Sequence, residues 1–318
     1  MMSPASLVDD LFTTTMLEEL HGLVDIDTSA VATEKDVAVH RVRDAEIAIA
    51  GWGAPRISPH DAPNLRALVY LGGVAALCLD EPKTWAERGL LAANARSINA
   101  SPVAEYALAM ILLDGKDSFA AERRYRDRRD APAAARRGIA GNHRRTIGIV
   151  GLSHVARLLI ARLGTFDFDI VAFSPELTPE LAAAVGVRSA SLADVMAQSD
   201  VVSLHQPLTP ATVGQIDERM LSLMRDGATL LNTARGAVVD QDALVTELRS
   251  GRIRAILDVT APEPLPPEHE LWSLPNVVLT PHIAGSLGGE LHRMGENAVA
   301  EVRRFVTGES FRFPELIE

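Results

Sequence analysis

The 318-residue chain contains a single cysteine, Cys78, so it forms no internal disulfide and supplies no thiolate cluster for a metal. It lacks any apolar run approaching the ~20 residues that span a bilayer. Its first residues show no basic segment followed by an apolar stretch, the pattern of an export signal. We therefore expect a cytoplasmic protein with no metal site and no membrane contact.

The chain also contains fewer basic than acidic residues. Lys and Arg total 31 against 42 Asp and Glu, a formal net charge of −11. Because the phosphate backbone of nucleic acids repels such a chain, nucleic acid is excluded as a partner. The local exception is Glu122–Gly138, which carries seven arginines on an expected helix and the turn after it. We interpret this segment as a solvated face or a subunit contact, and an anion site is the less favoured alternative.

Two glycines are missing from a stretch that otherwise resembles the dinucleotide fingerprint G-x-G-x-x-G. In "GIVGLSHVAR" an apolar strand runs into a helix, with Gly151 at the first glycine position, Ser153 at the second and a small alanine at the third. The serine still leaves the amides of His154 and Val155 free at the helix N-terminus to bind an anion. Taken alone, this loop fits a cofactor loop and a plain strand-to-helix turn equally well.

Short apolar segments alternate with helix-like ones along most of the chain, which indicates parallel sheets. Composition is 47% apolar and 23% charged, and the length suits two domains of ordinary size. Because the strand candidates are continuously apolar, we expect helices on both faces of each sheet. The expected strands are 36–42, 45–51, 66–73, 145–151, 168–174, 201–207, 228–234, 254–260 and 276–282.

These strands fall into an early and a late group. Between the groups we expect one long helix over 101–126, with Ser101 as its N-cap and Pro102 at its first position. The final helix, about 288–308, has no strand after it to pair with the late group. This helix is therefore available to pack against the first domain.

Four motifs occur in order in the C-terminal half: "SDVVSLHQPLTPATVGQID", "LLNTARGAVVDQDALVTELRSGRI", "LDVTAPEPLP" and "LPNVVLTPHIAGS". With "ERGLLAANARSINASPVAEYALAMIL" upstream, the chain from about Arg66 to the last helix resembles the D-isomer specific 2-hydroxyacid dehydrogenases. The resemblance implies an α/β fold of two Rossmann-like or flavodoxin-like parallel-sheet domains. A discontinuous substrate domain, 1–99 plus 288–318, would hold an inserted NAD(P)-binding domain, 100–287, with the site in the cleft between them. It also implies a homodimer joined through the nucleotide domains.

The family exchanges a hydride between nicotinamide and C2 of a 2-oxo or 2-hydroxy acid. The resemblance assigns three catalytic side chains. Arg235 of "NTARG" would bind the substrate carboxylate and carbonyl oxygen, and His282 of "PHIAG" would transfer the proton. Glu263, five residues after Asp258, would hold and charge-stabilise the imidazole. Formate dehydrogenases of the superfamily carry glutamine at that position, which argues against formate as the substrate.

Cofactor and substrate contacts follow from the same matching. Ser174 replaces the acid that would hold the adenosine ribose, which opens the site to NADP. Glu176 and Glu180 follow without an arginine, so NAD is the favoured cofactor.

The identity of the substrate acid does not follow from the sequence. The Asp-Asn pair that relatives carry after the carboxylate-binding loop is absent, so no specific acid can be named. The expected cofactor residues are Gly151, Ser153, His154, Val155, Ser174, His205, Pro207, Thr212, Thr233, Ala234, Arg235, Asp258, His282 and Gly285, and the expected substrate-binding residues are Leu71, Gly72, Gly73 and Arg235.

The family also includes regulators that sense NADH and act as corepressors, and fold alone does not settle function. Retention of all three catalytic side chains favours an enzyme. The chain ends about ten residues after its last helix, so we expect no appended regulatory or partner-binding domain. An NAD(H)-binding sensor remains the alternative.

Overall fold

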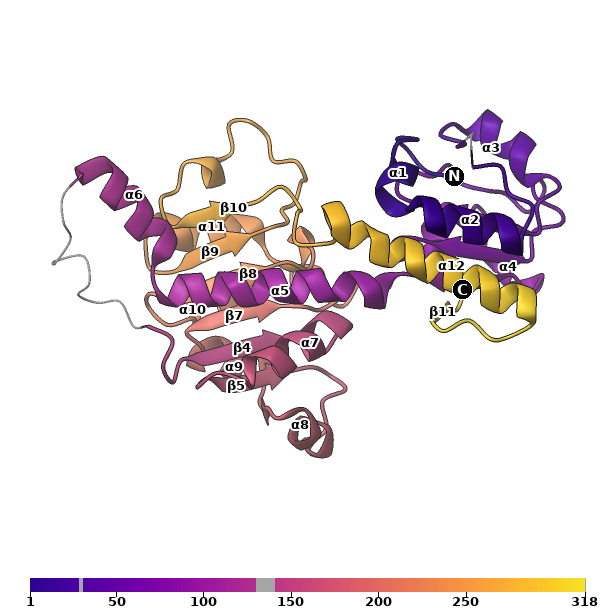
Figure 1. Ribbon diagram of the computed structural model, residues 1–318. Helices are drawn as coiled ribbons and strands as arrows, with labels where there is room; N and C mark the ends of the chain where they lie inside the picture. Colours follow the sequence, from indigo (N-terminus) through magenta and orange to yellow (C-terminus); the bar gives the residue numbers. More distant parts are fainter. Residues whose placement is uncertain (29–30, 130–140, 318) are drawn as a thin grey trace. The chain divides into compact units, whose positions relative to one another are not determined.

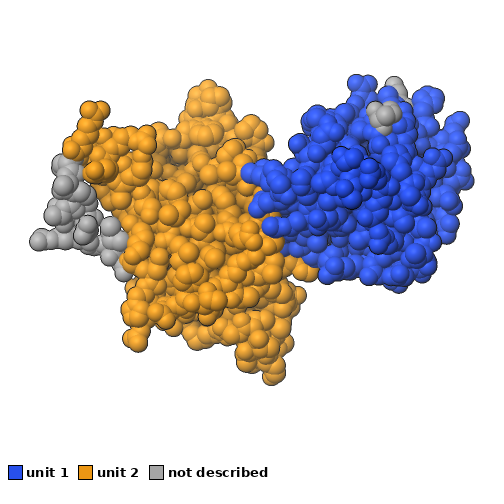
Figure 2. All heavy atoms as spheres, viewed as in Figure 1, with its two compact units in different colours: residues 1–100, 286–318 blue, residues 101–285 orange. Residues whose placement is uncertain are grey.

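The computed structural model describes residues 1–28, 31–129 and 141–317. The chain separates into two compact units, one formed by Met1–Ala100 with Ser286–Glu318 and the other by Ser101–Gly285 (Figure 2). Each unit has its own sheet and its own apolar clusters.

Unit 1 is built on a four-stranded sheet in the order β1-β2-β3-β11. Strands β1 (Ile47–Ala50), β2 (Ala67–Tyr70) and β3 (Leu91–Asn94) are parallel, and β11 (Pro314–Glu315) runs antiparallel to β3. Apolar residues of α1 (Leu7–Leu11), α2 (Thr14–Leu23) and α12 (His292–Thr307) cover one face, and those of α3 (Lys35–Val42) and α4 (Pro82–Glu87) cover the other. The last helix therefore packs within unit 1.

Unit 2 carries a seven-stranded, fully parallel sheet in the order β10-β9-β8-β7-β4-β5-β6 (Figure 1). Helices α5, α7 and α8 cover one face, and α9, α10 and α11 cover the other. The strands are β4 (Thr146–Val150), β5 (Asp169–Phe173), β6 (Arg188–Ser189), β7 (Val201–Leu204), β8 (Thr229–Asn232), β9 (Arg254–Leu257) and β10 (Val277–Leu279). The helices are α5 (Arg96–Gly115), α6 (Ser118–Arg128), α7 (His154–Leu163), α8 (Pro179–Val185), α9 (Leu192–Gln198), α10 (Glu218–Ser222) and α11 (Gln241–Arg249).

This strand order reverses between β4 and β7. In a doubly wound sheet, ligands bind outside the carboxyl ends of the strands at such a reversal. The loops that follow β4 and β7 are therefore the first place to look for a nucleotide site.

One expected strand is wrong. Residues 36–42 form most of helix α3, where Ala38 and Val42 are buried four positions apart and Val37 is 45% exposed. Only that i, i+4 pair faces the core, and this is the spacing of a helix rather than of a strand. Each of the other expected strands contains an observed strand, whereas β3, β6 and β11 were not expected.

The long helix also differs from its expected form. It begins at Arg96, whose amide donates to Asn94 Oδ1 at 3.0 Å, so Pro102 lies inside the helix and Ser101 is not its N-cap. It ends at Gly115, and Asp117 then adopts a left-handed conformation with φ 51° before α6 begins. The expected single helix is therefore two.

No helix among the described residues is long and apolar enough to cross a membrane. The same residues contain no cluster of three or more His, Cys, Asp or Glu side chains that could hold a metal ion. Cys78 is buried in the core of unit 1.

Candidate active site

The loop after β4 is shaped for an anion. Gly151 has φ +90°, and a Cβ there would lie 2.6 Å from the backbone nitrogen of Gln206, so the chain segments after β4 and β7 touch. Ser153 caps α7, and its hydroxyl accepts from the Ala156 amide at 3.4 Å. The amides of His154 and Val155 at the start of this helix have no acceptor among the described residues. Free amides at a helix N-terminus are suited to a phosphate group.

Two buried polar atoms at neighbouring strand ends have no partner in the described part of the chain: Thr233 Oγ1 after β8 and Gln206 Oε1 after β7. Buried oxygens are normally hydrogen-bonded, so unpaired ones at a strand edge indicate a ligand position. The His205 ring, expected at the cofactor, is buried and its Nε2 lies 2.8 Å from the Ser203 hydroxyl. Burial lowers the pKa of His205 to about 4 and keeps the ring neutral.

Two further residues expected at the cofactor, Thr212 and Ser174, lie in ordered turns. Thr212 Oγ1 donates to the Pro207 carbonyl at 2.6 Å and accepts from the Thr209 amide at 2.8 Å, which closes the loop after β7. Ser174 follows β5, with its hydroxyl 3.5 Å from Glu176 Oε1. A carboxylate therefore stands beside the position where the family's acidic residue is missing.

The three expected catalytic side chains come from three neighbouring strands. Arg235 follows β8, Glu263 follows β9 and His282 follows β10, and because these strands are parallel their carboxyl ends share one edge of the sheet. His282 Nδ1 lies 2.7 Å from Glu263 Oε1, with the side chains 51% and 40% exposed. An ionised carboxylate only accepts, so Nδ1 carries the hydrogen and Nε2 is left for another partner.

The backbone at His282 is held in an unusual conformation. Its φ is +55°, a region that costs a non-glycine residue roughly 1–2 kcal/mol. The carboxylate of Asp258, which is 2% exposed, accepts from the Thr280 hydroxyl at 2.6 Å and from the amides of Ile283 and Ala284 at 2.9 Å each. The turn that presents His282 is thus folded around Asp258.

Tyr106, on α5, extends this network. Its hydroxyl lies 2.6 Å from Thr280 Oγ1. Because the single hydroxyl hydrogen of Thr280 goes to the Asp258 carboxylate, Tyr106 is the donor in this contact. Burial raises the pKa of Tyr106, so the donor proton is retained.

Arg235 is positioned by residues that sequence reasoning missed. Asn232, 1% exposed, donates to the Arg235 carbonyl at 2.9 Å and accepts from the Ala234 amide at 3.0 Å. A Cβ at Gly236 would lie 2.0 Å from the Thr260 carbonyl carbon, so the loops carrying Arg235 and Glu263 pack backbone to backbone. Both residues flank Arg235 in "NTARG", where a glycine shortly after a strand was the available signal.

In unit 1 the expected amide donors are only partly available. The Leu71 amide donates to the Ala50 carbonyl at 2.8 Å as part of the sheet, so it cannot also receive a substrate. The amides of Gly72 and Gly73 have no acceptor among the residues described. A Cβ at Gly72 would lie 2.5 Å from the Tyr70 ring, so any larger residue here would force that ring to shift.

The chain is similar to known proteins over most of its length. Residues 108–284 match the model of the D-isomer specific 2-hydroxyacid dehydrogenase NAD binding domain. The chain is 35% identical over 251 residues to D-3-phosphoglycerate dehydrogenase of Mycobacterium leprae, an alignment covering 78% of this chain and 46% of that one. The chain spans about half the length of the phosphoglycerate dehydrogenases it matches in this way.

Two further relatives align over nearly the whole chain. Glyoxylate reductase of Korarchaeum cryptofilum is 30% identical over 298 residues, covering 92% of this chain and 89% of that one. The crystal structure of D-lactate dehydrogenase from Aquifex aeolicus, complexed with NAD and lactic acid, superposes with a TM-score of 0.71 at 26% identity, covering 93% and 92% of the two chains. The chain belongs to the D-isomer specific 2-hydroxyacid dehydrogenase family.

Proposed function

We propose that the protein is an oxidoreductase that transfers a hydride between a nicotinamide cofactor and C2 of a small 2-oxo or 2-hydroxy acid. The observation that carries this proposal is the 2.7 Å contact between His282 and Glu263, on the strand edge that also presents the exposed Arg235. A histidine with one nitrogen held by a carboxylate and the other free is arranged for proton transfer.

The residues at this edge fit a dinucleotide. The free amides of His154 and Val155 suit its pyrophosphate, and the unpaired Thr233 hydroxyl suits its nicotinamide half. We assign Gly151, Pro207, Thr212, Ala234 and Gly285 to the surrounding walls by their place in these loops. When bound, nicotinamide supplies the hydride acceptor or donor. Every other step belongs to side chains of this chain.

In the reduction direction, His282 Nε2 gives its proton to the carbonyl oxygen, and in oxidation it removes the hydroxyl proton. Glu263 keeps the hydrogen on Nδ1 and stabilises the charged ring. The planar fork of Arg235 binds the substrate carboxylate and polarises the carbonyl. The free amides of Gly72 and Gly73 are further candidate donors to the carboxylate.

We propose NAD as the preferred cofactor. The Glu176 carboxylate beside Ser174 would place negative charge near a 2′-phosphate, and the sequence from Ser174 to Val187 contains no arginine to neutralise it. The small Ser174 leaves room for NADP at lower affinity.

We also propose a cytoplasmic homodimer. Helix α6 carries four arginines and buries none of its side chains, including Tyr125, which is 60% exposed. A partner subunit would cover such a helix. Residues 130–138 of the arginine-rich segment lie outside the described residues.

A nicotinamide absorbance assay tests the activity. NADH and NADPH are offered separately with glyoxylate, hydroxypyruvate, pyruvate and longer branched or aromatic 2-oxo acids. We expect turnover of at least one acid with NADH, and its loss in His282→Ala with NADH binding retained. Tight NADH binding without turnover of any acid would instead support the sensor alternative.

A further inference from the structure

The loop after β2 in unit 1 has backbone amides that meet no acceptor in the described part of the chain. The Leu71 amide is the last in the sheet and donates to the Ala50 carbonyl at 2.8 Å. The next three amides, those of Gly72, Gly73 and Val74, have no acceptor among the described residues. These three are the loop amides. Successive amides of this kind are suited to an anion.

Glu315, a half-buried residue of β11, marks the other end of this stretch. Its carboxylate accepts from the amides of Ala75 at 2.9 Å and Ala76 at 3.2 Å, which begin the 3-10 helix η1 (Ala75–Cys78). Asn94, 8% exposed, donates its side-chain NH₂ to the same carboxylate at 2.6 Å. Three donors therefore converge on one carboxylate directly after the loop amides.

The carbonyl groups of the loop are held from the other side. The Gly72 carbonyl accepts from the Ala95 amide at 2.9 Å, and the Gly73 carbonyl accepts from Arg96 Nε at 2.9 Å. Because a trans peptide unit is planar, holding the Gly72 carbonyl points the Gly73 amide the opposite way. The bond to Gly73 fixes the Val74 amide in the same manner.

We propose that Glu315 is a positioning residue for the substrate carboxylate, a role that rests on the proposed function. Glu315 holds the turn that follows the loop amides, so the loop cannot rotate them away from the substrate. Asn94 joins this contact to the second support, because its Oδ1 accepts from the Arg96 amide at 3.0 Å while its NH₂ donates to Glu315.

Two features of the chain support this role. The loop lacks the Asp-Asn pair that relatives carry, and Glu315 and Asn94 supply a carboxylate and an amide to the same stretch from two other segments. The Glu315 carboxylate also engages the amides of Ala75 and Ala76. The substrate carboxylate is thereby limited to the loop amides that precede them.

Glu315→Gln tests the role at nearly constant side-chain size. Glutamine has one acceptor oxygen and one donor NH₂, so at least one of the three surrounding donors then faces another donor. Glu315→Ala, in which water reaches these donors, is measured beside it. Hydrogen exchange of the Ala75 and Ala76 amides should become at least about tenfold faster in both variants.

Steady-state kinetics on a 2-oxo acid that the wild type turns over supply the second measurement. KM should rise about tenfold, the effect of one lost hydrogen bond, while kcat and the NADH dissociation constant stay within about twofold. Removal of a negative charge would by itself favour an anionic substrate, so a rise in KM reports lost positioning. An unchanged KM, or a loss confined to kcat, would overturn the proposal.

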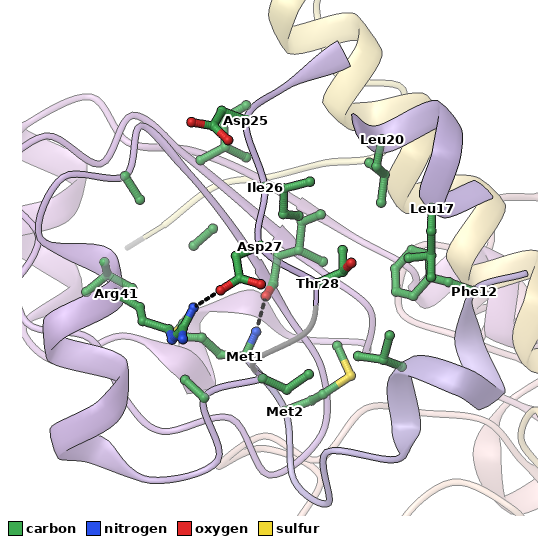
Figure 3. A pocket seen from close by; sticks show the side chains of 18 residues that line it. Met1, Met2, Phe12, Leu17, Leu20, Asp25, Ile26, Asp27, Thr28 and Arg41 are labelled. Atoms are coloured by element: carbon green, nitrogen blue, oxygen red, sulfur yellow. Dashed lines mark hydrogen bonds and ion pairs between the residues drawn. The ribbon is translucent and has the colours of Figure 1, made fainter. Parts of the chain in front are cut away.

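A control variant separates positioning from a general loss of stability. Leu17 lines a cavity of about 310 Å³ in unit 1, whose lining includes no residue of the loop or of its supports (Figure 3). Leu17→Ala enlarges this cavity and should lower the melting temperature with KM unchanged. An equal rise of KM in Leu17→Ala would show that Glu315 acts only through stability, against the proposal.

A binding experiment distinguishes failure of this role from failure of the proposed function. Oxamate keeps the carboxylate of a 2-oxo acid, and its effect on the NMR signals of the Gly72 and Gly73 amides is followed in the wild type and in Glu315→Gln. If no acid is turned over but oxamate shifts these signals in the wild type alone, the proposed function fails and the role of Glu315 stands. If oxamate shifts them equally in both proteins, or in neither, the role of Glu315 fails whatever the activity.

Discussion

Replacing Asp258 with asparagine tests what holds His282, the proposed catalytic histidine, in place. The carboxylate accepts three hydrogen bonds, from the Thr280 hydroxyl and from the amides of Ile283 and Ala284. An asparagine of the same shape has one acceptor oxygen and one donor NH₂. In the favourable orientation the asparagine oxygen still accepts hydrogen bonds from the Thr280 hydroxyl and the Ile283 amide. Its NH₂ group then faces the Ala284 amide, and because both groups are donors no hydrogen bond forms between them.

The expected loss of unfolding free energy follows from the hydrogen bonds that the asparagine cannot make. One hydrogen bond to a charged group is lost, worth ~1.5–3 kcal/mol, and a buried donor is left unsatisfied at a further ~1–3 kcal/mol. Because the turn is near the surface and can relax, we expect Asp258→Asn to lose about 3 kcal/mol of unfolding free energy. Relaxation releases His282 from its left-handed backbone. A displacement of ~1 Å at a catalytic group is enough to lower kcat about 10²-fold.

Urea unfolding and steady-state kinetics on a turned-over 2-oxo acid measure both effects, with NADH binding followed separately. Thr280→Val and Tyr106→Phe form a graded control series. Thr280→Val removes the hydrogen bond from the Thr280 hydroxyl to the Asp258 carboxylate. Tyr106→Phe removes only the neutral hydrogen bond from Tyr106 to Thr280, which is worth ~0.5–1.5 kcal/mol. The losses of unfolding free energy and of kcat should be largest in Asp258→Asn, smaller in Thr280→Val and smallest in Tyr106→Phe. Unfolding free energy and kcat equal to those of the wild type in Asp258→Asn would refute the reasoning, and a loss confined to NADH affinity would instead support the expected role of Asp258 as a cofactor residue.

Three further predictions concern single side chains. Glu263→Gln keeps the size but removes the charge beside His282, so reductase activity should fall first at the alkaline end of the pH–rate profile; an unmoved profile would contradict the pair. Ser174→Asp should raise the ratio of NADPH to NADH dissociation constants by repelling the 2′-phosphate, and titration of both cofactors into both proteins measures it. Burial lowers the pKa of His205 from 6.5 to about 4, so the unfolded state binds more protons between these values and unfolding free energy should rise by about 3 kcal/mol as pH rises through that window. His205→Gln should flatten this rise in urea titrations, and equal slopes would contradict the assignment.

The sequence predicted the elements whose signal is local. Continuous apolar runs located eight strands, whereas "LAAN" of β3 contains too few β-formers to stand out, and the alternating valines of α3 imitated a strand. In the candidate site, the sequence predicted only those contacts that join residues of recognisable motifs. The contact between His282 and Glu263 follows from two motifs, but Tyr106 and Thr280 are 174 residues apart and only packing brings them together. The contacts that order the turn carrying His282 therefore could not be predicted from the sequence.

The missing glycines of the fingerprint show how backbone geometry sets which positions can change. Gly151 at φ +90° and Gly236, where a Cβ would lie 2.0 Å from a carbonyl carbon, leave no room for a side chain, and both remain glycine. Ser153 has φ −66° and ψ 175°, an extended conformation open to any residue. Its hydroxyl caps α7 at the Ala156 amide, one residue beyond the free amides of His154 and Val155. The substitution thus adds a helix cap, which contributes typically ~1 kcal/mol, and leaves free the two amides that we propose bind the pyrophosphate.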